Sequence, residues 1–175
     1  MSPITTCLWF DTQAEEAAKF YVSVFKKSKM GRISRYGKEG FEIHQKPEGS
    51  VQTVNFQILG QSFTALNGGP IFKFTEAVSF QVFCKDQKEL DYYWTKLTKG
   101  GDPNSQVCGW LKDKFGVSWQ VVPAVLDKLL TSKDKAASGR TMEALLEMKK
   151  LEIKKLQAAY DGPTAKKRRT AARKK

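Results

Sequence analysis

Few residues of this 175-residue chain have side chains suited to acid–base, nucleophilic or metal chemistry. His44 is its one histidine, and the three cysteines, Cys7, Cys84 and Cys108, show no paired spacing. One imidazole and scattered thiols do not supply the closed ligand set of a zinc site. An odd number of cysteines, without a basic and apolar leader, is typical of free thiols in a reducing compartment. We therefore expect no cofactor and a cytoplasmic location.

Two residues are candidates for direct chemistry. Cys7 is the candidate nucleophile, but no basic neighbour is evident that would lower its pKa. The alternative interpretation of Cys7 is a small buried apolar residue. His44 lies in a polar stretch between two predicted strands, where it is either a general base on a flexible loop or simply solvated. The sequence leaves these alternatives open.

The positive charge is concentrated at the C-terminal end. Seven lysines and arginines follow Asp161, with no acidic residue among them, and subtracting them from the net charge of +12 leaves +5 for the rest of the chain. Such a composition predicts a disordered tail from Thr164 to Lys175. The tail has the charge to bind nucleic acid weakly and without sequence preference. The alternative is a solubilising tail with incidental affinity for polyanions.

The elements that must position any site come as a repeat. Thr12–Glu15 and Asp86–Glu89 each offer an N-cap oxygen and a glutamate three residues later, the capping-box pattern, at an offset of 74 residues. Each follows an apolar stretch and leads into a helix with an apolar stripe. Further strands are predicted at 32–36, 51–59, 62–66, 107–111 and 117–122, with a turn at Gly60-Gln61. The order predicts two β-α-β-β-β halves, the second with a weak strand after its helix.

The C-terminal part begins with a hairpin. Asp113 and Gly116 bracket a tight turn, and the strand after it must stop at Pro123. A short helix is predicted after Pro123, then a polar hinge, then one amphipathic helix that opens at Thr141, runs through Leu156 and ends at Asp161-Gly162-Pro163. We expect this helix to dock on its own domain or on a second copy in a homodimer. A membrane partner is not expected, because the apolar stripe lacks Trp and Phe anchors.

The hairpin Asp113-Lys114-Phe115-Gly116, the opening Cys7–Asp11 and the run Ala65–Pro70 together resemble the PhnB-like branch of the vicinal-oxygen-chelate superfamily. Members often carry the name 3-demethylubiquinone-9 3-methyltransferase. The resemblance spans Ile4 to Pro123 and implies an α+β class, the glyoxalase/bleomycin-resistance/dihydroxybiphenyl dioxygenase fold, whose paired β-α-β-β-β modules curl around a cavity. It predicts a paired-module domain at 1–123, C-terminal helices at 124–162 and a disordered basic tail at 163–175.

The resemblance also implies where a metal would be held. Superfamily enzymes bind a divalent ion through four side chains, whose positions correspond here to Thr5, Ala65, Ser79 and Gln120. Only Gln120 is a conventional ligand type. We therefore predict a metal-independent protein that binds an unidentified small molecule, with its status as an enzyme left open. The alternative is a metal-dependent lyase, isomerase or dioxygenase.

The predicted cavity face has apolar and aromatic side chains with a few neutral hydrogen-bonding groups, the usual lining of a small-molecule pocket. The predicted ligand-binding residues are Thr5, Cys7, Trp9, Asn55, Phe63, Asn67, Ser79, Gln81 and Gln120. A methyltransferase mechanism is rejected, because the chain has no Gly-rich strand-to-helix turn for S-adenosylmethionine.

Overall fold

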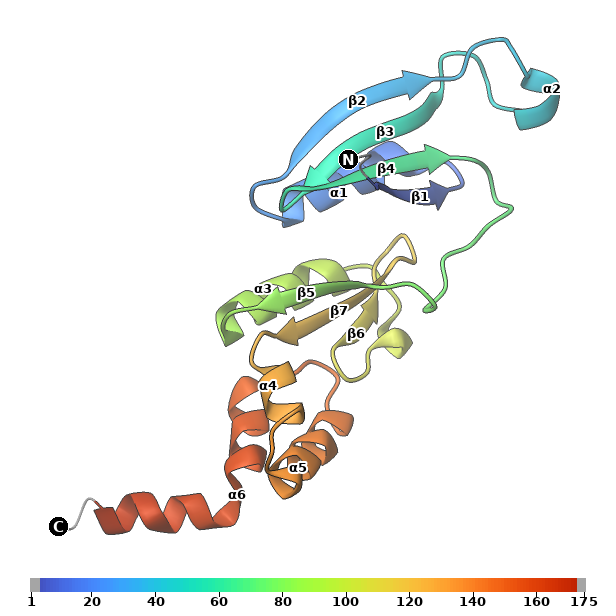
Figure 1. Ribbon diagram of the computed structural model, residues 1–175. Coiled ribbons are helices and arrows are strands. Elements are labelled where there is room, and N and C mark those ends of the chain that lie inside the picture. The colour runs from blue at the N-terminus through green and yellow to red at the C-terminus, as the bar shows by residue number, and fades with distance from the viewer. Residues whose placement is uncertain (1–3, 173–175) are drawn as a thin grey trace. The chain divides into compact units, whose positions relative to one another are not determined.

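The computed structural model describes residues 4–172, with side chains as far as Pro163. The chain forms two compact units, the first ending at Thr75 and the second beginning at Glu76. Each unit is built on one β-sheet crossed by one long helix (Figure 1). Within the described residues, the helices are all too short or too polar to span a bilayer.

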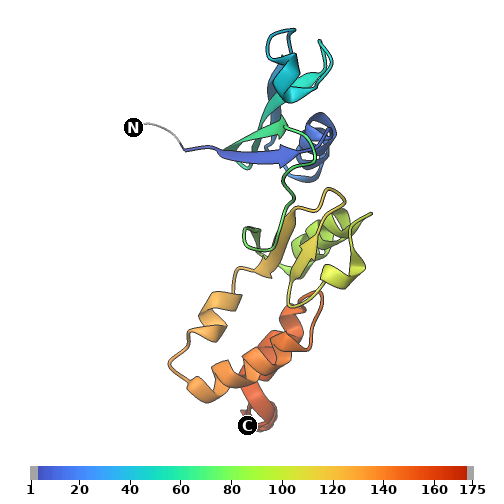
Figure 2. The ribbon, with the colours of Figure 1, turned by 90° about the vertical axis from the view of Figure 1, so that its right-hand side faces the viewer.

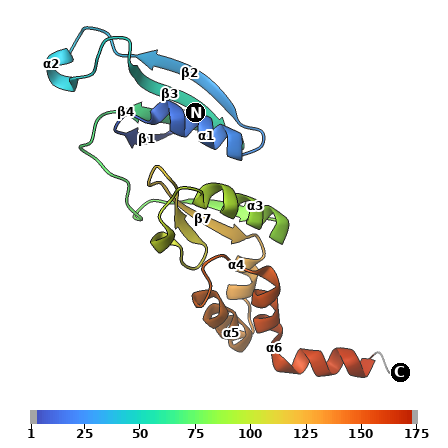
Figure 3. The ribbon, with the colours of Figure 1, turned by 180° about the vertical axis from the view of Figure 1, so that it is seen from behind.

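The first unit has the predicted β-α-β-β-β order. Its elements are β1 (Thr6–Phe10), α1 (Ala14–Val24), β2 (Lys29–Arg35), the short α2 (Phe41–His44), β3 (Val51–Ile58) and β4 (Gln61–Asn67). The sheet order is β1-β4-β3-β2, with β1 parallel to β4 and the other pairs antiparallel. Seen from behind, α1 lies in front of this sheet (Figure 3). One face is thus covered by α1, and the other face of the unit is open.

The core of the first unit lies between α1 and the sheet. Tyr21 of α1 stacks on Phe56 at 6.1 Å between ring centroids, and Phe56 stacks on Phe63 of β4 at 5.2 Å. The remaining buried side chains follow the two periodicities, every second residue in the strands and one stripe of the helix. They include Leu8, Phe10, Ala14, Ala17, Ala18, Val24, Val54, Ile58 and Ala65.

The turn between β3 and β4 falls one residue earlier than predicted. Ile58 pairs with Gln61, so the two turn residues are Leu59 and Gly60, with φ of 50° and 87°. Positive φ at both positions is the signature of a type I′ hairpin turn, which favours glycine. This pairing places Asn55 directly opposite Thr64, so odd residues of β3 share a face with even residues of β4.

The two helix starts are capped differently. For α1 the predicted capping box is wrong: its N-cap residue, Gln13, makes no side-chain cap, and the Ala14 N–H donates instead to Asn67 Oδ1 at 2.8 Å. The second helix, α3 (Gln87–Thr98), is capped as predicted, because Asp86 accepts from the Glu89 N–H at 2.8 Å. The Glu89 carboxylate in turn accepts a hydrogen bond from the Lys85 N–H at 2.9 Å.

The second unit repeats the first in shortened form. Its sheet has the order β5-β7-β6, from β5 (Phe80–Cys84), β6 (Trp110–Lys112) and β7 (Ser118–Pro123), and α3 covers one face. β5 pairs with β7 in parallel, as β1 does with β4. Between α3 and β6 the described chain has a 3₁₀ turn (Pro103–Ser105) and an isolated bridge of Val107 with Trp110. The predicted strand at 107–111 is thus a bridge at Val107 followed by β6, and the weak strand predicted before it does not form in the described residues.

The Asp113 hairpin has a structural role, because its hydrogen bonds hold the turn before β7. The Gly116 N–H donates to the Asp113 carbonyl at 2.9 Å and closes the turn. Asp113 is 2% exposed: its Oδ1 accepts from the Phe115 and Val117 N–H groups at 2.9 and 3.1 Å, and its Oδ2 accepts from Trp119 Nε1 at 2.8 Å. Such a satisfied carboxylate fixes the turn before β7. The motif thus explains the fold and offers no free acid for catalysis.

Three further helices belong to the second unit: α4 (Leu126–Leu130), α5 (Lys135–Leu146) and α6 (Ile153–Ala172). α5 and α6 lie side by side (Figure 2), and Arg140 of α5 donates to the carbonyls of Ala159 and Tyr160 at 2.9 and 2.7 Å. α6 is kinked at Gly162, and its backbone continues as helix to Ala172. Side chains from residue 164 onward and all of 173–175 lie outside the described residues, so the disordered tail and its nucleic-acid binding stay predictions.

The prediction of one continuous helix from Thr141 through Leu156 is wrong. The chain leaves α5 after Leu146 and becomes helical again only at Ile153. In between, the carbonyls of Met148 and Lys149 accept from the N–H groups of Cys108 and Gly109 at 2.7 and 2.8 Å. Non-local backbone pairing with the loop before β6 therefore replaces local helix bonds over this stretch.

Candidate functional site

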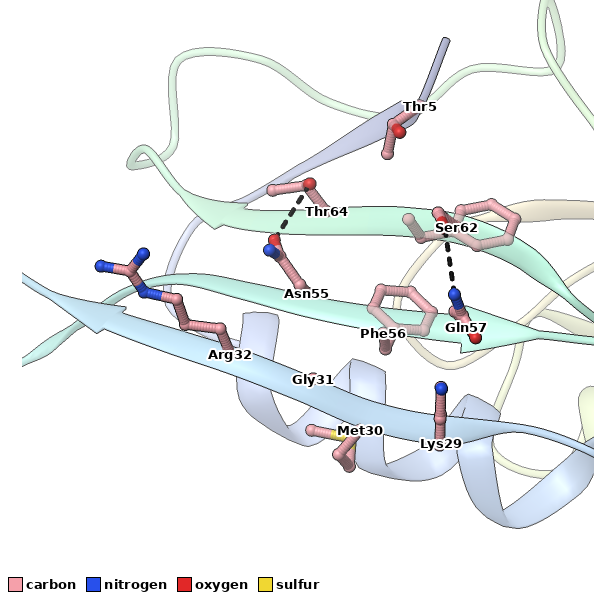
Figure 4. Close-up of a pocket in the computed structure, with 11 residues that line it drawn as sticks. Thr5, Lys29, Met30, Gly31, Arg32, Asn55, Phe56, Gln57, Ser62 and Thr64 are labelled. Atoms are coloured by element: carbon pink, nitrogen blue, oxygen red, sulfur yellow. Dashed lines mark hydrogen bonds between the residues drawn. The ribbon is translucent and has the colours of Figure 1, made fainter. Parts of the chain in front are cut away.

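A pocket of about 410 Å³ lies on the open face of the first sheet (Figure 4). Residues of β2, β3 and β4 and the start of the chain before β1 line it. The lining consists of Thr5, Lys29, Met30, Gly31, Arg32, Asn55, Phe56, Gln57, Ser62, Phe63 and Thr64. Of the polar side chains in this lining, none is a carboxylate or an imidazole.

Cross-strand hydrogen bonds organise the pocket floor. Thr64 Oγ1 donates to Asn55 Oδ1 at 3.2 Å, and Gln57 Nε2 donates to Ser62 Oγ at 3.3 Å (Figure 4). Both pairs join β3 to β4 and follow from the type I′ turn, which sets these residues opposite each other. The floor therefore presents neutral hydroxyl and amide groups held by the sheet itself.

Three of the predicted ligand-binding residues, Thr5, Asn55 and Phe63, line this pocket. Five polar residues that the predicted set did not include also line it: Lys29, Arg32, Gln57, Ser62 and Thr64. A signal for the last two was available in the sequence. A two-residue hairpin turn forces odd residues of β3 and even residues of β4 onto one face, so Asn55 must lie beside Thr64 and not beside Phe63.

Phe63 and Asn67 accordingly lie on the face of the sheet that α1 covers. The sequence interpretation placed them on the open face instead. The Phe63 side chain packs on Phe56 in the core, although the residue borders the pocket. Asn67 is 6% exposed, and its side chain joins three elements: Oδ1 accepts from the Ala14 N–H, and Nδ2 donates to the Val51 carbonyl at 3.0 Å. Its backbone carbonyl accepts from the Tyr36 hydroxyl at 2.6 Å.

Cys7 and Trp9 share the open face through the parallel pairing of β1 with β4 but do not line the pocket. Cys7 is exposed, which excludes the buried alternative, and desolvation by the surrounding sheet raises the pKa of its thiol. A raised pKa leaves less thiolate at neutral pH and disfavours a nucleophilic role. Trp9 Nε1 donates to the Gly69 carbonyl at 2.8 Å, and its ring lies so close to Gly68 that a side chain there would overlap it.

The His44 ring makes a polar contact at each of its two nitrogens. Its Nδ1 accepts from the Lys46 N–H at 2.9 Å, and its Nε2 lies 3.2 Å from the Glu39 carbonyl. The ring packs against Tyr36 at 4.4 Å between centroids. A neutral imidazole with its proton on Nε2 satisfies both contacts. His44 therefore holds the connection between β2 and β3, outside the pocket lining.

In the second unit the structure brings together three predicted residues. Gln120 Nε2 donates to Ser79 Oγ at 2.8 Å, and Gln81 Nε2 donates to Gln120 Oε1 at 3.2 Å. Their common face follows from the parallel pairing of Gln81 with Gln120. This neutral cluster is a hydrogen-bonding surface on the sheet face opposite α3.

The residues at the implied metal positions do not fit a divalent ion. Ala65 has no donor atom and is fully buried under α1, while Ser79 and Gln120 bond to each other. Thr5 adds only a neutral hydroxyl, a poor substitute for carboxylate or imidazole. Throughout the described part of the chain, His, Cys, Asp and Glu side chains form no group of three or more that could hold a metal ion.

The family model described as 3-demethylubiquinone-9 3-methyltransferase matches residues 2–122. The chain belongs to this PhnB-like family of the vicinal-oxygen-chelate superfamily. The PhnB protein of Bacillus cereus, which carries the same methyltransferase description, is similar at 38% identity, with a TM-score of 0.59 over 70% of this chain and 100% of its own. The family match ends within β7, so α4, α5 and α6 follow the shared PhnB-like part.

More distant structures resemble the PhnB-like chain in fold alone. The protein PA1353 of Pseudomonas aeruginosa is 16% identical, with a TM-score of 0.53 over 70% of this chain and 98% of its own. The fosfomycin resistance protein FosX of Listeria monocytogenes is 15% identical, covering 75% of this chain and 98% of its own at a TM-score of 0.49. No curated protein matches the chain.

Proposed function

We propose that this PhnB-like chain is a metal-independent binding protein for a small molecule, held in the pocket on the open face of the first sheet. The observation that carries the proposal is the pocket itself, about 410 Å³ in volume. Hydroxyl and amide side chains such as Asn55 and Thr64 line it beside apolar walls. That volume is in the range of small-molecule sites, and the polar groups offer a ligand several hydrogen-bonding partners.

The donor chemistry favours this function over its rival, a metal-dependent lyase, isomerase or dioxygenase. Of the four side chains at the implied metal positions, Gln120 alone is a common ligand type, and it is engaged with Ser79 and Gln81. The name of the family also suggests methyl transfer. The crossing from β1 to α1 runs through Asp11, Thr12 and Gln13, which gives no Gly-rich cradle for S-adenosylmethionine.

Metal analysis and native mass spectrometry of protein purified without chelators test the proposal. We expect nickel, zinc, manganese and iron far below one per chain, and a co-purified small molecule that is released on unfolding. A near-stoichiometric metal, lost in Gln120→Ala and retained in the control Gln106→Ala, would establish the rival instead. A chain with neither metal nor ligand, and no saturable binding across a metabolite panel, would also contradict the proposal.

We further propose that the protein is a homodimer, with the exposed apolar residues of α5 at the contact. Met142 and Leu146 are 42% and 63% exposed, and they lie four positions apart on one helix face. Light scattering is expected to give twice the chain mass, falling to one chain mass in Leu146→Glu. A monomer for the unmodified protein would contradict this proposal and leave the binding function untouched.

A further inference from the structure

We propose that the pocket of the first sheet is selective for an anionic ligand, a small molecule with a phosphate, phosphonate or carboxylate group that Lys29 and Arg32 recognise. This inference rests on the proposed function, because it names the ligand class of the same pocket. It starts from an imbalance of charge: two cationic side chains and no acidic one line the pocket.

The local geometry of β2 places both cations on the open face. In the ladder with β3, Met30 pairs with Phe56 and Ile33 pairs with Val54, so Gly31 and Arg32 stand together opposite Asn55. Two residues opposite one is a β-bulge. In a regular strand Arg32 would alternate away from Lys29, whereas the extra residue returns it to the Lys29 side (Figure 4).

Gly31 is the residue that permits this bulge. A Cβ atom at this position would lie 2.9 Å from the Asn55 carbonyl oxygen and 3.3 Å from the Asn55 Cβ. Any side chain there would therefore force β2 away from β3. A glycine inside a strand often marks such a close backbone approach, so Gly31 allows the bulge that sets the position of Arg32.

The two cations are uncommitted in the part of the chain that the structure describes. The ion pairs of the first unit join Lys19 to Glu15, Lys38 to Glu48 and Lys46 to Asp11, and none includes Lys29 or Arg32. An anion in the pocket would therefore gain both charges without breaking an existing pair. The guanidinium of Arg32 also offers the forked donors that suit phosphate and carboxylate oxygens.

The hydroxyl and amide groups of the floor complete the match. Thr5, Ser62 and Thr64 have hydroxyl groups that donate or accept, and Asn55 and Gln57 supply amide groups. A ligand with an anionic head and a polar body would meet charge at β2 and hydrogen bonds at β3 and β4. A neutral ligand would fill the pocket and leave Lys29 and Arg32 without a counter-charge.

The basic residues after Asp161 also attract anions, so the test must resolve individual residues. We would titrate the full-length ¹⁵N-labelled protein with inorganic phosphate, methylphosphonate, acetate and neutral glycerol, and follow backbone amide shifts. The pocket variant is Lys29→Gln with Arg32→Gln. The matched control is Arg35→Gln, which removes an exposed arginine of the same strand that bonds to the Gly49 carbonyl and does not line the pocket.

We expect the anions, and not glycerol, to give saturable shifts at Gly31, Asn55 and Thr64. The dissociation constant should rise by about tenfold in the pocket variant, the effect expected for losing two solvent-exposed charge contacts. It should stay within about twofold in Arg35→Gln, a control that keeps both charge contacts. Pocket shifts that are absent, or equally strong in the pocket variant, would overturn the inference.

This result separates the inference from the proposed function. If a neutral molecule co-purifies and shifts the same amides while the anions do not, the pocket binds a small molecule and the anion inference alone is wrong. If the anions shift only tail amides and nothing else occupies the pocket, both are wrong.

Discussion

Replacing Asn67 by alanine tests whether this residue is structural or part of a binding surface. Its side chain makes two hydrogen bonds, from the Ala14 N–H at 2.8 Å and to the Val51 carbonyl at 3.0 Å. Both Asn67 and Ala14 are buried, at 6% and 0% exposure. In Asn67→Ala the first N–H of α1 loses its cap in a place that water does not reach.

The expected loss follows from these contacts. Removing a helix N-cap costs about 1 kcal/mol, and leaving a buried donor unsatisfied costs about 1–3 kcal/mol. With the Val51 bond also lost, we expect the free energy of unfolding of the first unit to fall by about 2–4 kcal/mol. Asn67→Asp keeps an acceptor for Ala14, but it also buries a carboxylate and sets an oxygen against the Val51 carbonyl, so we expect it to be destabilised as well, by about 1–3 kcal/mol.

The matched control is Asn55→Ala, an asparagine of the same sheet on its open face. Its side chain makes one exposed hydrogen bond, with Thr64, so the change in stability should stay within about 0.5 kcal/mol. Amide hydrogen exchange of β3 and β4, compared between variants, reports the first unit separately. If Asn67→Ala and Asn55→Ala were equally stable, the cap would contribute nothing and the reasoning would be refuted.

Three further outcomes are expected. Asp113→Ala should destabilise the second unit by about 3–5 kcal/mol, seen as faster exchange in β7, because three donors lose a buried carboxylate; no change would contradict the hairpin's role. Burial, and then the nearby Glu89 and Asp86 charges, raise the pKa of Cys84 from 9.0 to about 12. Iodoacetamide at pH 8 should therefore label Cys7 and spare Cys84 until the protein unfolds. The raised pKa of Cys84 stabilises the folded state below pH 9. This stabilisation is lost as the pH rises towards 12, and Cys84→Ala should reduce the loss. Finally, Gln87→Ala should release the start of α6, because the Gln87 side chain accepts from the Ile153 N–H at 2.8 Å and donates to the Leu151 carbonyl at 3.1 Å; increased proteolysis between α5 and α6 would show this, and Gln106→Ala should cause none.

Several features could be predicted from the sequence because neighbouring residues determine them. The cap of α3 depends on Asp86 and Glu89, three positions apart, and the Asp113 turn on residues within one hairpin. The repeat of strand, helix and parallel strand is likewise visible as apolar periodicity. These signals predict alternating strands and helices, whereas the PhnB-like family was recognised from the resemblance of the Asp113 hairpin, the opening Cys7–Asp11 and the run Ala65–Pro70.

The candidate site was decided by contacts between residues far apart in the chain. The cap of α1 comes from Asn67, 53 positions away, so the local Thr12–Glu15 pattern was not used. The bulge at Gly31 exists because β2 approaches β3, and only that approach turns Arg32 onto the Lys29 side. The break between α5 and α6 depends on pairing with the loop at Cys108. Local propensity cannot report such contacts, because their energy appears only when distant segments pack together.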